Sequence, residues 1–160
     1  MTRLMAILTA LLLGTAAIAQ TNINLGGIRT NPKAPVEVSA DNLSVDQDTG
    51  TAVFSGNVVI GQGDLRLSAG AVRVVYSEAT GDIAQLIASG NVTFVTESEA
   101  AEASEADYNL TTGMLILSGN VLLTQGASAL SAEKMTIHLT TGNAEMSGRV
   151  RTVFKQDGGN

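Results

Sequence analysis

A four-residue pattern, Ser-Gly-Asn-Val, recurs along this chain and constrains its fold more than any other feature. It begins at Ser55, Ser89 and Ser118, and a variant with arginine in place of asparagine begins at Ser147. Successive pattern glycines are 34, 29 and 29 residues apart. Such a spacing is typical of one supersecondary unit stacked on copies of itself. The sequence therefore predicts a repeat protein, whose single repeats cannot fold alone.

Two further markers divide each repeat. A Thr-Gly pair precedes each pattern, beginning at Thr49, Thr80, Thr112 and Thr141. Glycine adopts a positive φ without steric cost, so this pair predicts a tight turn between antiparallel strands. An alanine begins an alternating stretch further upstream, at Ala40, Ala69, Ala106 and Ala132. One unit is therefore predicted to run strand, turn, strand, turn.

Alternation within the repeats indicates which face is buried. Counting two residues back, and two and four forward, from each pattern glycine selects twelve positions, eleven of them apolar: Phe54, Val58, Ile60, Ala88, Val92, Phe94, Leu117, Val121, Leu123, Met146, Val150 and the polar Thr152. Side chains two apart on a strand share a face, so we expect these residues to point inward. Aromatic residues make up only 3% of the chain, and the core must therefore be aliphatic. Three apolar residues, Val59, Val95 and Leu122, break the polar character of the opposite face.

The N-terminus predicts export. Arg3 precedes an apolar stretch over residues 4–13, and Ala17, Ile18 and Ala19 form an A-x-A cleavage pattern. The apolar stretch is shorter than the roughly 20 residues that span a bilayer. We therefore expect a cleavable signal peptide over residues 1–19, a flexible leader over 20–35 that contains both prolines, one domain over 36–154, and a short polar tail over 155–160.

The charge balance argues against nucleic acid as a partner. Without the signal peptide the chain has 8 basic and 15 acidic residues, a net charge of −7. A duplex-binding protein needs a stripe of Lys and Arg to neutralise phosphates. The densest charged cluster here is acidic, over residues 97–107, and residues 96–104 are rich in Ala, Ser and Glu. We expect this segment to be an exposed insertion between repeats.

Few residues suggest chemistry. His138 is the single histidine, and alternation places it opposite Ile137 and toward solvent. A general base needs an oriented partner and a pocket, and neither is indicated. Asp46 begins a stretch that resembles a calcium loop but lacks the downstream bidentate Glu, so an Asx-type turn explains it better. The chain has no Cys. The sequence thus predicts no enzymatic activity, no catalytic residue, no metal site and no cofactor.

Several segments together resemble the LptA family of OstA-like periplasmic lipopolysaccharide-transport proteins. The first runs from Ala52 through Ser-Gly-Asn-Val to Gly63 and continues with Leu65, Leu67, Ala69, Val72 and Val74. Later segments that fit are Ala106–Tyr108, Leu117–Gly126, Ala132–Lys134 and Arg149–Val153. The resemblance covers residues 36–154. Arg149 departs from the family pattern in the last copy.

This resemblance implies an all-β fold, an OstA-like open β-jelly roll of antiparallel strands built from repeated strand-turn-strand units, in which two sheets enclose an apolar groove. It implies binding of lipopolysaccharide through its lipid A acyl chains, end-to-end self-association, an LptC-like inner-membrane partner and an LptD-like outer-membrane partner. The expected location is the periplasm.

Candidate site residues follow from the resemblance and from the apolar face. Candidates for the lipid groove are Phe54, Val58, Ile60, Leu65, Leu67, Val92, Phe94, Leu117, Val121, Leu123, Met135, Ile137 and Val150. Candidates for docking at the sheet edges are Val36, Val38, Met146, Val150 and Val153. The groove residues could equally pack a core, and the sequence does not separate the two roles. A ligand-free secreted β-repeat scaffold is the alternative function.

Overall fold

The computed structural model describes residues 21–24, 31 and 33–153, and these residues form one antiparallel sheet of eleven strands. The strands are β1 (Thr21–Asn24), β2 (Glu37–Ser39), β3 (Asn42–Asp46), β4 (Thr51–Gln62), β5 (Leu65–Tyr76), β6 (Ile83–Val95), β7 (Glu99–Asn109), β8 (Met114–Gln125), β9 (Ser128–His138), β10 (Asn143–Ser147) and β11 (Arg151–Val153). The predicted all-β fold of repeated strand-turn-strand units is confirmed.

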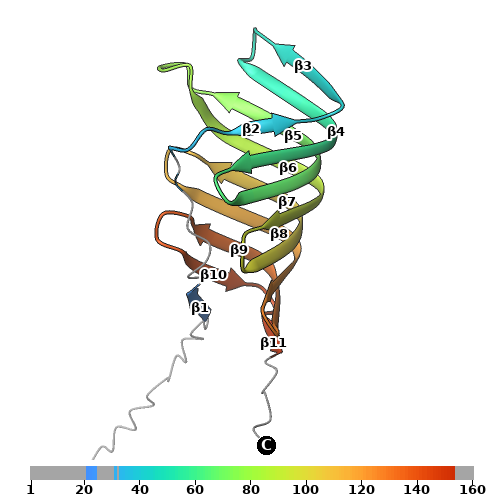
Figure 1. Cartoon of the computed structure of the whole chain (residues 1–160), viewed down its shortest axis with the longest axis vertical. Helices are drawn as coiled ribbons and strands as arrows, with labels where there is room; N and C mark the ends of the chain where they lie inside the picture. The colour runs from blue at the N-terminus through green and yellow to red at the C-terminus, as the bar shows by residue number, and fades with distance from the viewer. Residues whose placement is uncertain (1–20, 25–30, 32, 154–160) are drawn as a thin grey trace, which may run out of the picture.

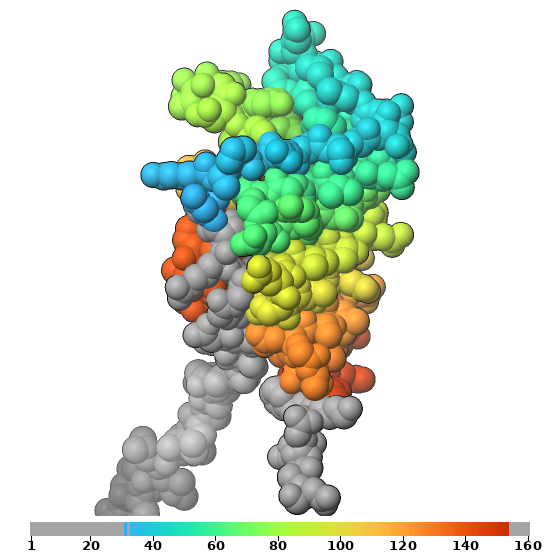
Figure 2. All heavy atoms as spheres, viewed as in Figure 1, coloured from blue at the N-terminus to red at the C-terminus, as the bar shows by residue number. Residues whose placement is uncertain are grey.

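Strands β4 to β10 each pair with their neighbours in sequence, so the sheet is a meander along the long axis of the molecule (Figure 1). The colours in Figure 2 follow one another in bands for the same reason. Near each end of the sheet, one long strand pairs with two short strands on the same side. β2 and β3 both pair with β4, and β10 and β11 both pair with β9. At one end β1 departs from sequence order and pairs with β10.

The Ser-Gly-Asn-Val pattern forms a β-bulge. Between Ser55 and Val58 the register of β4 against β5 shifts, and the same shift recurs in β6 and β8. In each copy the glycine and the residue after it both have positive φ, for example 80° at Gly56 and 46° at Asn57. Asparagine tolerates this left-handed region better than most residues. Two consecutive left-handed residues add one residue to the strand and bend it.

Because every long strand bends at the same level, the sheet folds into two facing layers (Figure 1). We call the layer that contains β3 and β10 the β10 wall; it also contains residues 51–55, 71–76, 83–89, 105–109, 114–118 and 134–138. The layer that contains β2 and β11 is the β11 wall, with residues 58–62, 65–69, 92–95, 99–103, 121–125 and 128–132. The two layers that the family resemblance implied are thus two halves of one hydrogen-bonded sheet.

In β4, β6 and β8, buried and exposed residues alternate without interruption through the bulge. In β5, β7 and β9, which lie between these strands, the alternation shifts by one residue at the bend. In β5 the buried residues are Leu65, Leu67 and Ala69, and then Val72 and Val74. Strands β7 and β9 show the same shift. Small residues occupy the narrow inner corner, where Ala69, Ala103 and Ala132 each lie opposite a pattern valine. In the third unit the corner alanine is Ala103, whereas Ala106, the alanine that marks the predicted alternating stretch, begins the buried alternation beyond the corner.

The Thr-Gly pairs form the predicted turns. Gly50, Gly81, Gly113 and Gly142 all have positive φ. In the first of these turns, the backbone N–H groups of Asp48 and Thr49 donate to Oδ1 of Asp46, at 2.9 and 3.2 Å. These hydrogen bonds, chiefly those from Thr49, lower the pKa of Asp46. The Asx-type turn predicted at Asp46 is confirmed.

One prediction is wrong: residues 96–104 are not an exposed insertion. Strand β7 begins at Glu99, and Glu99, Ala101 and Ala103 are buried. The sequence misled because alanine is the only apolar residue in this alternating stretch, and its small side chain gives a weak signal. Residues 21–24, within the expected leader, form β1. The predicted signal peptide over 1–19 and the tail over 155–160 lie outside the described residues.

The bulges generate a stability prediction. A Cβ added at Gly119 would lie 2.7 Å from Cβ of Ser104, whereas one added at Gly126 would meet nothing within 4 Å, and both glycines have positive φ. We expect Gly126→Ala to cost about 1–2 kcal/mol for the left-handed backbone, and Gly119→Ala to cost about 1–3 kcal/mol more for the overlap. Chemical denaturation of both variants measures this difference. Equal losses would show that the bulge is not closely packed against β7.

Candidate functional site

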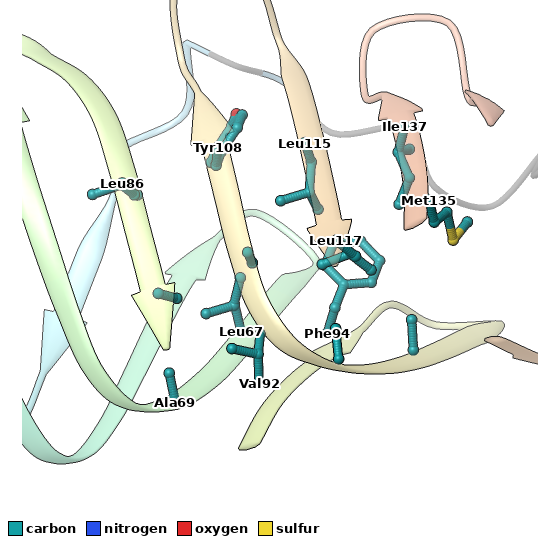
Figure 3. Close-up of a cluster of buried hydrophobic side chains, with 14 of the residues drawn as sticks. Leu67, Ala69, Leu86, Val92, Phe94, Tyr108, Leu115, Leu117, Met135 and Ile137 are labelled. Atoms are coloured by element: carbon teal, nitrogen blue, oxygen red, sulfur yellow. The ribbon is translucent and has the colours of Figure 1, made fainter. Parts of the chain in front are cut away.

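The largest coherent feature of the described residues is the apolar interior between the two walls. Side chains from successive strands form rows across each wall because directly paired residues share a face. One row of the β11 wall runs through Val38, Ile60, Leu67, Phe94, Ala101, Leu123 and Leu130. The corresponding row of the β10 wall runs through Leu43, Phe54, Val72, Ala88, Ala106, Leu117, Met135 and Met146. Figure 3 shows part of this interior, including Leu67 and Phe94 of the first row and Leu117 and Met135 of the second.

The structure brings the predicted groove residues together. Eleven of the thirteen are buried in one cluster: Val58, Ile60, Leu65, Leu67, Val92, Phe94, Leu117, Val121, Leu123, Met135 and Ile137. Phe54 and Val150 are half-buried and pack against the cluster. All thirteen lie on the inner face. Their burial is equally consistent with core packing and with lipid contact, so the division between these roles stays a prediction.

Sequence reasoning missed much of the same surface, chiefly in the β10 wall. The missed buried residues include Val72, Val74, Leu86, Tyr108, Leu115 and Leu139. Counting from the pattern glycines stops at Ala88 and Leu117, two residues short of Leu86 and Leu115, and it does not reach the strands between the pattern strands. Pairing each pattern strand with its neighbour through the Thr-Gly turns would have located Val72 and Val74.

One polar bridge crosses the aliphatic interior. Tyr108 of the β10 wall donates from its hydroxyl to Oε1 of Gln62, in the β11 wall, at 2.8 Å. Gln62 in turn donates from Nε2 to the backbone oxygen of Ala34 at 3.1 Å, just before β2. Gln62 is 1% exposed and Tyr108 is 5% exposed. Because these residues come from β4 and β7, which are not neighbours in the sheet, the bridge ties the two walls together at their open margin, away from the bend.

A second buried polar group closes the turn between β6 and β7. Glu99, 3% exposed, accepts hydrogen bonds from the hydroxyls of Thr96 and Ser98 at 2.7 and 2.6 Å, and from Nε2 of Gln125 at 3.1 Å. A buried carboxylate needs such donors, since burial without them is costly. Glu99 is therefore a structural residue of the turn and not part of the acidic surface expected around it.

The two ends of the sheet differ. At one end, among residues 21–24, 31 and 33–153, no strand pairs with β2 or β3 beyond β4. The inner-face side chains of Leu43 and Val45 in β3 are 56% and 61% exposed. Val36 and Val38, the edge candidates at this end, are partly buried against the core. Unpaired edge strands can accept a strand from another chain. Sequence reasoning missed Leu43 and Val45, although their alternation in β3 would have revealed them.

At the other end β1 covers β10, whereas β11 pairs only with β9 along the described sheet. The expectation that Met146 lies on an open edge is wrong, because Met146 is fully buried in β10 between β9 and β1. Val153 in β11 is 67% exposed. The open part of this edge is therefore β11.

His138 is exposed, on the outer face of β9. Within residues 21–24, 31 and 33–153 no group of three or more His, Cys, Asp or Glu side chains is arranged to hold a metal ion. The same part of the chain holds no helix of the length and hydropathy that a membrane span requires. The candidate functional features of the described residues are therefore the apolar inner face between the two walls and the two ends of the sheet.

Comparisons with known proteins place the chain in a family. Residues 37–143 match the sequence profile described as LptA/(LptD N-terminal domain) LPS transport protein. An uncharacterized protein of Rhizobium meliloti (strain 1021) is 30% identical in an alignment 112 positions long, which covers 65% of this chain and 60% of that protein. The chain thus spans less than two thirds of this relative's length.

A solved structure confirms the fold. The crystal structure of LptH, described as the LptA-homologous periplasmic component of the lipopolysaccharide transport device of Pseudomonas aeruginosa, superposes with a TM-score of 0.71 at 18% identity. The match covers 79% of this chain and 99% of that one. The matched family consists of transport proteins and is not enzymatic, in agreement with the sequence-based prediction.

The polar bridge generates a prediction for stability. We expect Tyr108→Phe to lower the free energy of unfolding by about 1–3 kcal/mol, because it removes a donor from a buried amide. The cost should be smaller in a Gln62→Met background, where that amide is already absent. A double-mutant cycle by chemical denaturation measures the coupling. Additive effects would show that the hydroxyl and the amide do not interact in solution.

Proposed function

Since the chain belongs to the LptA/LptD N-terminal family of lipopolysaccharide transport proteins, we propose that it binds lipopolysaccharide in the periplasm, shelters the acyl chains between its two walls, and bridges inner-membrane and outer-membrane transport complexes by end-to-end assembly. The observation that carries this proposal is the aliphatic inner face, which continues from strand to strand along the whole sheet.

An apolar conduit is what transport of a lipid through water requires. Each methylene kept from water is worth roughly 0.8 kcal/mol, so several acyl chains would be held back by a very large barrier without continuous shelter. The inner face supplies this shelter with Val, Leu, Ile, Met and Phe side chains. These side chains make dispersion contacts with hydrocarbon and offer no directional bond that would hold a lipid at one position.

Lipid entry requires the walls to part, because their own side chains fill the space between them. The ladder hydrogen bonds join neighbouring strands within the sheet and run along each wall. Opening at the margin opposite the bend therefore breaks side-chain packing and the bond between Tyr108 and Gln62, but leaves the ladders intact. Acyl chains that enter replace the lost apolar contacts, which offsets most of this cost.

The two sheet ends support the assembly part of the proposal. Exposed Leu43 and Val45 at one end, and β11 at the other, are suited to strand pairing with a similar fold. In an assembly of this kind the inner faces of successive proteins would join into one conduit. The partners we propose are further copies of this chain, an LptC-like protein at the inner membrane and an LptD-like protein at the outer membrane.

Adjacent residues on opposite faces provide the test of lipid binding. Val121 is 1% exposed and Leu122 is 39% exposed, and both follow the same bulge in β8. We expect a photo-crosslinking amino acid at Val121 to capture lipopolysaccharide, and one at Leu122 to capture little, because only Val121 faces the interior. Asn57 also faces outward but would be a poor control, because its positive φ would strain a bulky substitute.

A second pair, Leu67 and Ser68 in β5, repeats the comparison on another strand. Equal capture at both members of each pair would contradict the interior site. No capture at any position, in protein whose circular dichroism shows an intact fold, would favour the ligand-free β-repeat scaffold.

A further inference from the structure

The strand that covers β10 comes from the chain's own N-terminal region. In β1, Thr21 lies opposite Met146, Asn22 opposite Glu145, Ile23 opposite Ala144 and Asn24 opposite Asn143, in antiparallel register. This pairing extends the β10 wall by one strand, while in the part of the chain that the structure describes the β11 wall ends at β11. The end of the sheet is therefore half covered.

The repeat shows which strand would continue the sheet at this place. β10 and β11 carry the last copy of the bulge pattern, with Met146 equivalent to Phe54 and Ala144 equivalent to Ala52. The free edge of β10 corresponds to the side of β4 that pairs with β5, where Val72 lies opposite Phe54 and Val74 opposite Ala52. On the other side of β4, Leu43 and Val45 of β3 lie opposite the same two residues, so β3 has the register of β5. A second copy that added its β3 to β10 in this register would therefore place Leu43 opposite Met146 and Val45 opposite Ala144.

β1 occupies this register itself. Thr21 stands where Leu43 of a second copy would stand, and Ile23 stands where Val45 would stand. The four residues of β1, Thr-Asn-Ile-Asn, repeat the pattern of Leu43–Asp46 in having a branched apolar residue at the third position between two polar residues. The direction is also the same, because both strands run antiparallel to the strand that they pair with.

The uncovered half offers the incoming chain a first contact. Strand β11 would pair with β2 of the second copy, as the corresponding half of β4 pairs with β5, because Val38 of β2 and Leu67 of β5 both lie opposite Ile60. Asp41 and Glu133 have equivalent places, since their backbone N–H groups donate to the oxygens of Gly56 and Gly148. On the other side of the first bulge the equivalent position is Gly70 of β5. In the continued sheet, Asp41 of the second copy would lie opposite Gly148 and Arg149. The Arg149 side chain pairs with Glu133 at 2.6 Å but stays 87% exposed, so a second acidic side chain can also approach it.

We propose that β1 is an intramolecular substitute for β3 of a second copy, and that end-to-end assembly exchanges one for the other. This inference rests on the end-to-end assembly in the proposed function. The second copy pairs its β2 with the open β11 first, and its β3 then displaces β1 from β10. In the free chain β1 protects the longer half of an apolar sheet end from unspecific pairing.

A disulfide lock tests the exchange. The natural chain has no Cys, so Ile23→Cys with Ala144→Cys introduces a single possible bond between directly opposite residues. Protein purified from the periplasm of a Gram-negative host would be studied by light scattering over a concentration series, oxidised and reduced. We expect the oxidised form to stay monomeric where the reduced form associates. The pair Thr93→Cys and Glu102→Cys, opposite each other in β6 and β7, is the control lock that should change nothing.

Removal of β1 should act in the opposite direction. In an edge strand only every second backbone N–H donates to the adjacent strand, and proline has no N–H. Asn22→Pro with Ile23→Pro therefore removes a hydrogen bond from β1 to β10, whichever of the two residues donates it. While β1 covers the binding site it raises the apparent dissociation constant of the second copy. We therefore expect its removal to lower that constant about tenfold.

The outcomes separate this inference from the assembly on which it rests. Association that Val45→Asp abolishes, but that neither the lock nor the proline pair alters, would overturn the role of β1 and leave end-to-end assembly standing. If no variant associates at any concentration, both assembly and exchange fall. A disulfide that forms between two chains in place of within one would also refute the intramolecular role.

Discussion

The fold depends on one backbone constraint, the pair of left-handed residues in each Ser-Gly-Asn-Val bulge. A long flat meander would expose one apolar face along its whole length. The bulges bend β4, β6 and β8 at the same level, and β10 and β11 continue the series as two strands, so the sheet closes on its own inner face. All four first-position glycines have a positive φ. In three copies an added Cβ would also overlap the neighbouring strand, at Asp41, Ser104 and Glu133, whereas at Gly90 it would meet Gly70 only at 3.5 Å. The asparagine at the second position, which tolerates positive φ, adds a polar contact in the first copy, where Nδ2 of Asn57 donates to Asp41.

The bend also explains how an interior can be packed and still be suited to a guest. Backbone hydrogen bonds stabilise each wall along its length, and the walls meet through side chains. Separating them therefore costs apolar contacts that a hydrocarbon chain can replace, and the polar bridge from Tyr108 to Gln62. A closed barrel would have to break ladder bonds to admit the same guest. Sequence-based counting from the bulge glycines found the inward residues next to the bulges of β4, β6 and β8 but not the tyrosine, since partners 46 residues apart leave no local signal.

The ends of the molecule follow from the same repeat. Any copy of the unit can continue the sheet, so an edge that is apolar on its inner face is both an assembly site and an aggregation hazard. The two ends meet this hazard differently. β3 leaves Leu43 and Val45 exposed, whereas β10 is covered by a strand with a comparable pattern from the same chain. Arg149 replaces asparagine in the copy at the second end, where it pairs with Glu133 at 2.6 Å and stays open to solvent.

The sequence by itself determined the local conformations. Glycine and asparagine placed the bulges, Thr-Gly placed the turns, and period-two alternation placed Phe54, Val58 and their equivalents on the inner face, because each of these signals depends on neighbours within a few residues. The tertiary structure decided what such signals do not encode. The strands between the pattern strands shift phase by one residue at the corner, and this shift follows from their partners' bulges and not from their own residues. Strand β7 is buried despite its alanines and glutamates, because strands on both sides hold it in the sheet. β1 pairs with a strand more than 100 residues away, since the folded sheet offers it a free edge in the right register.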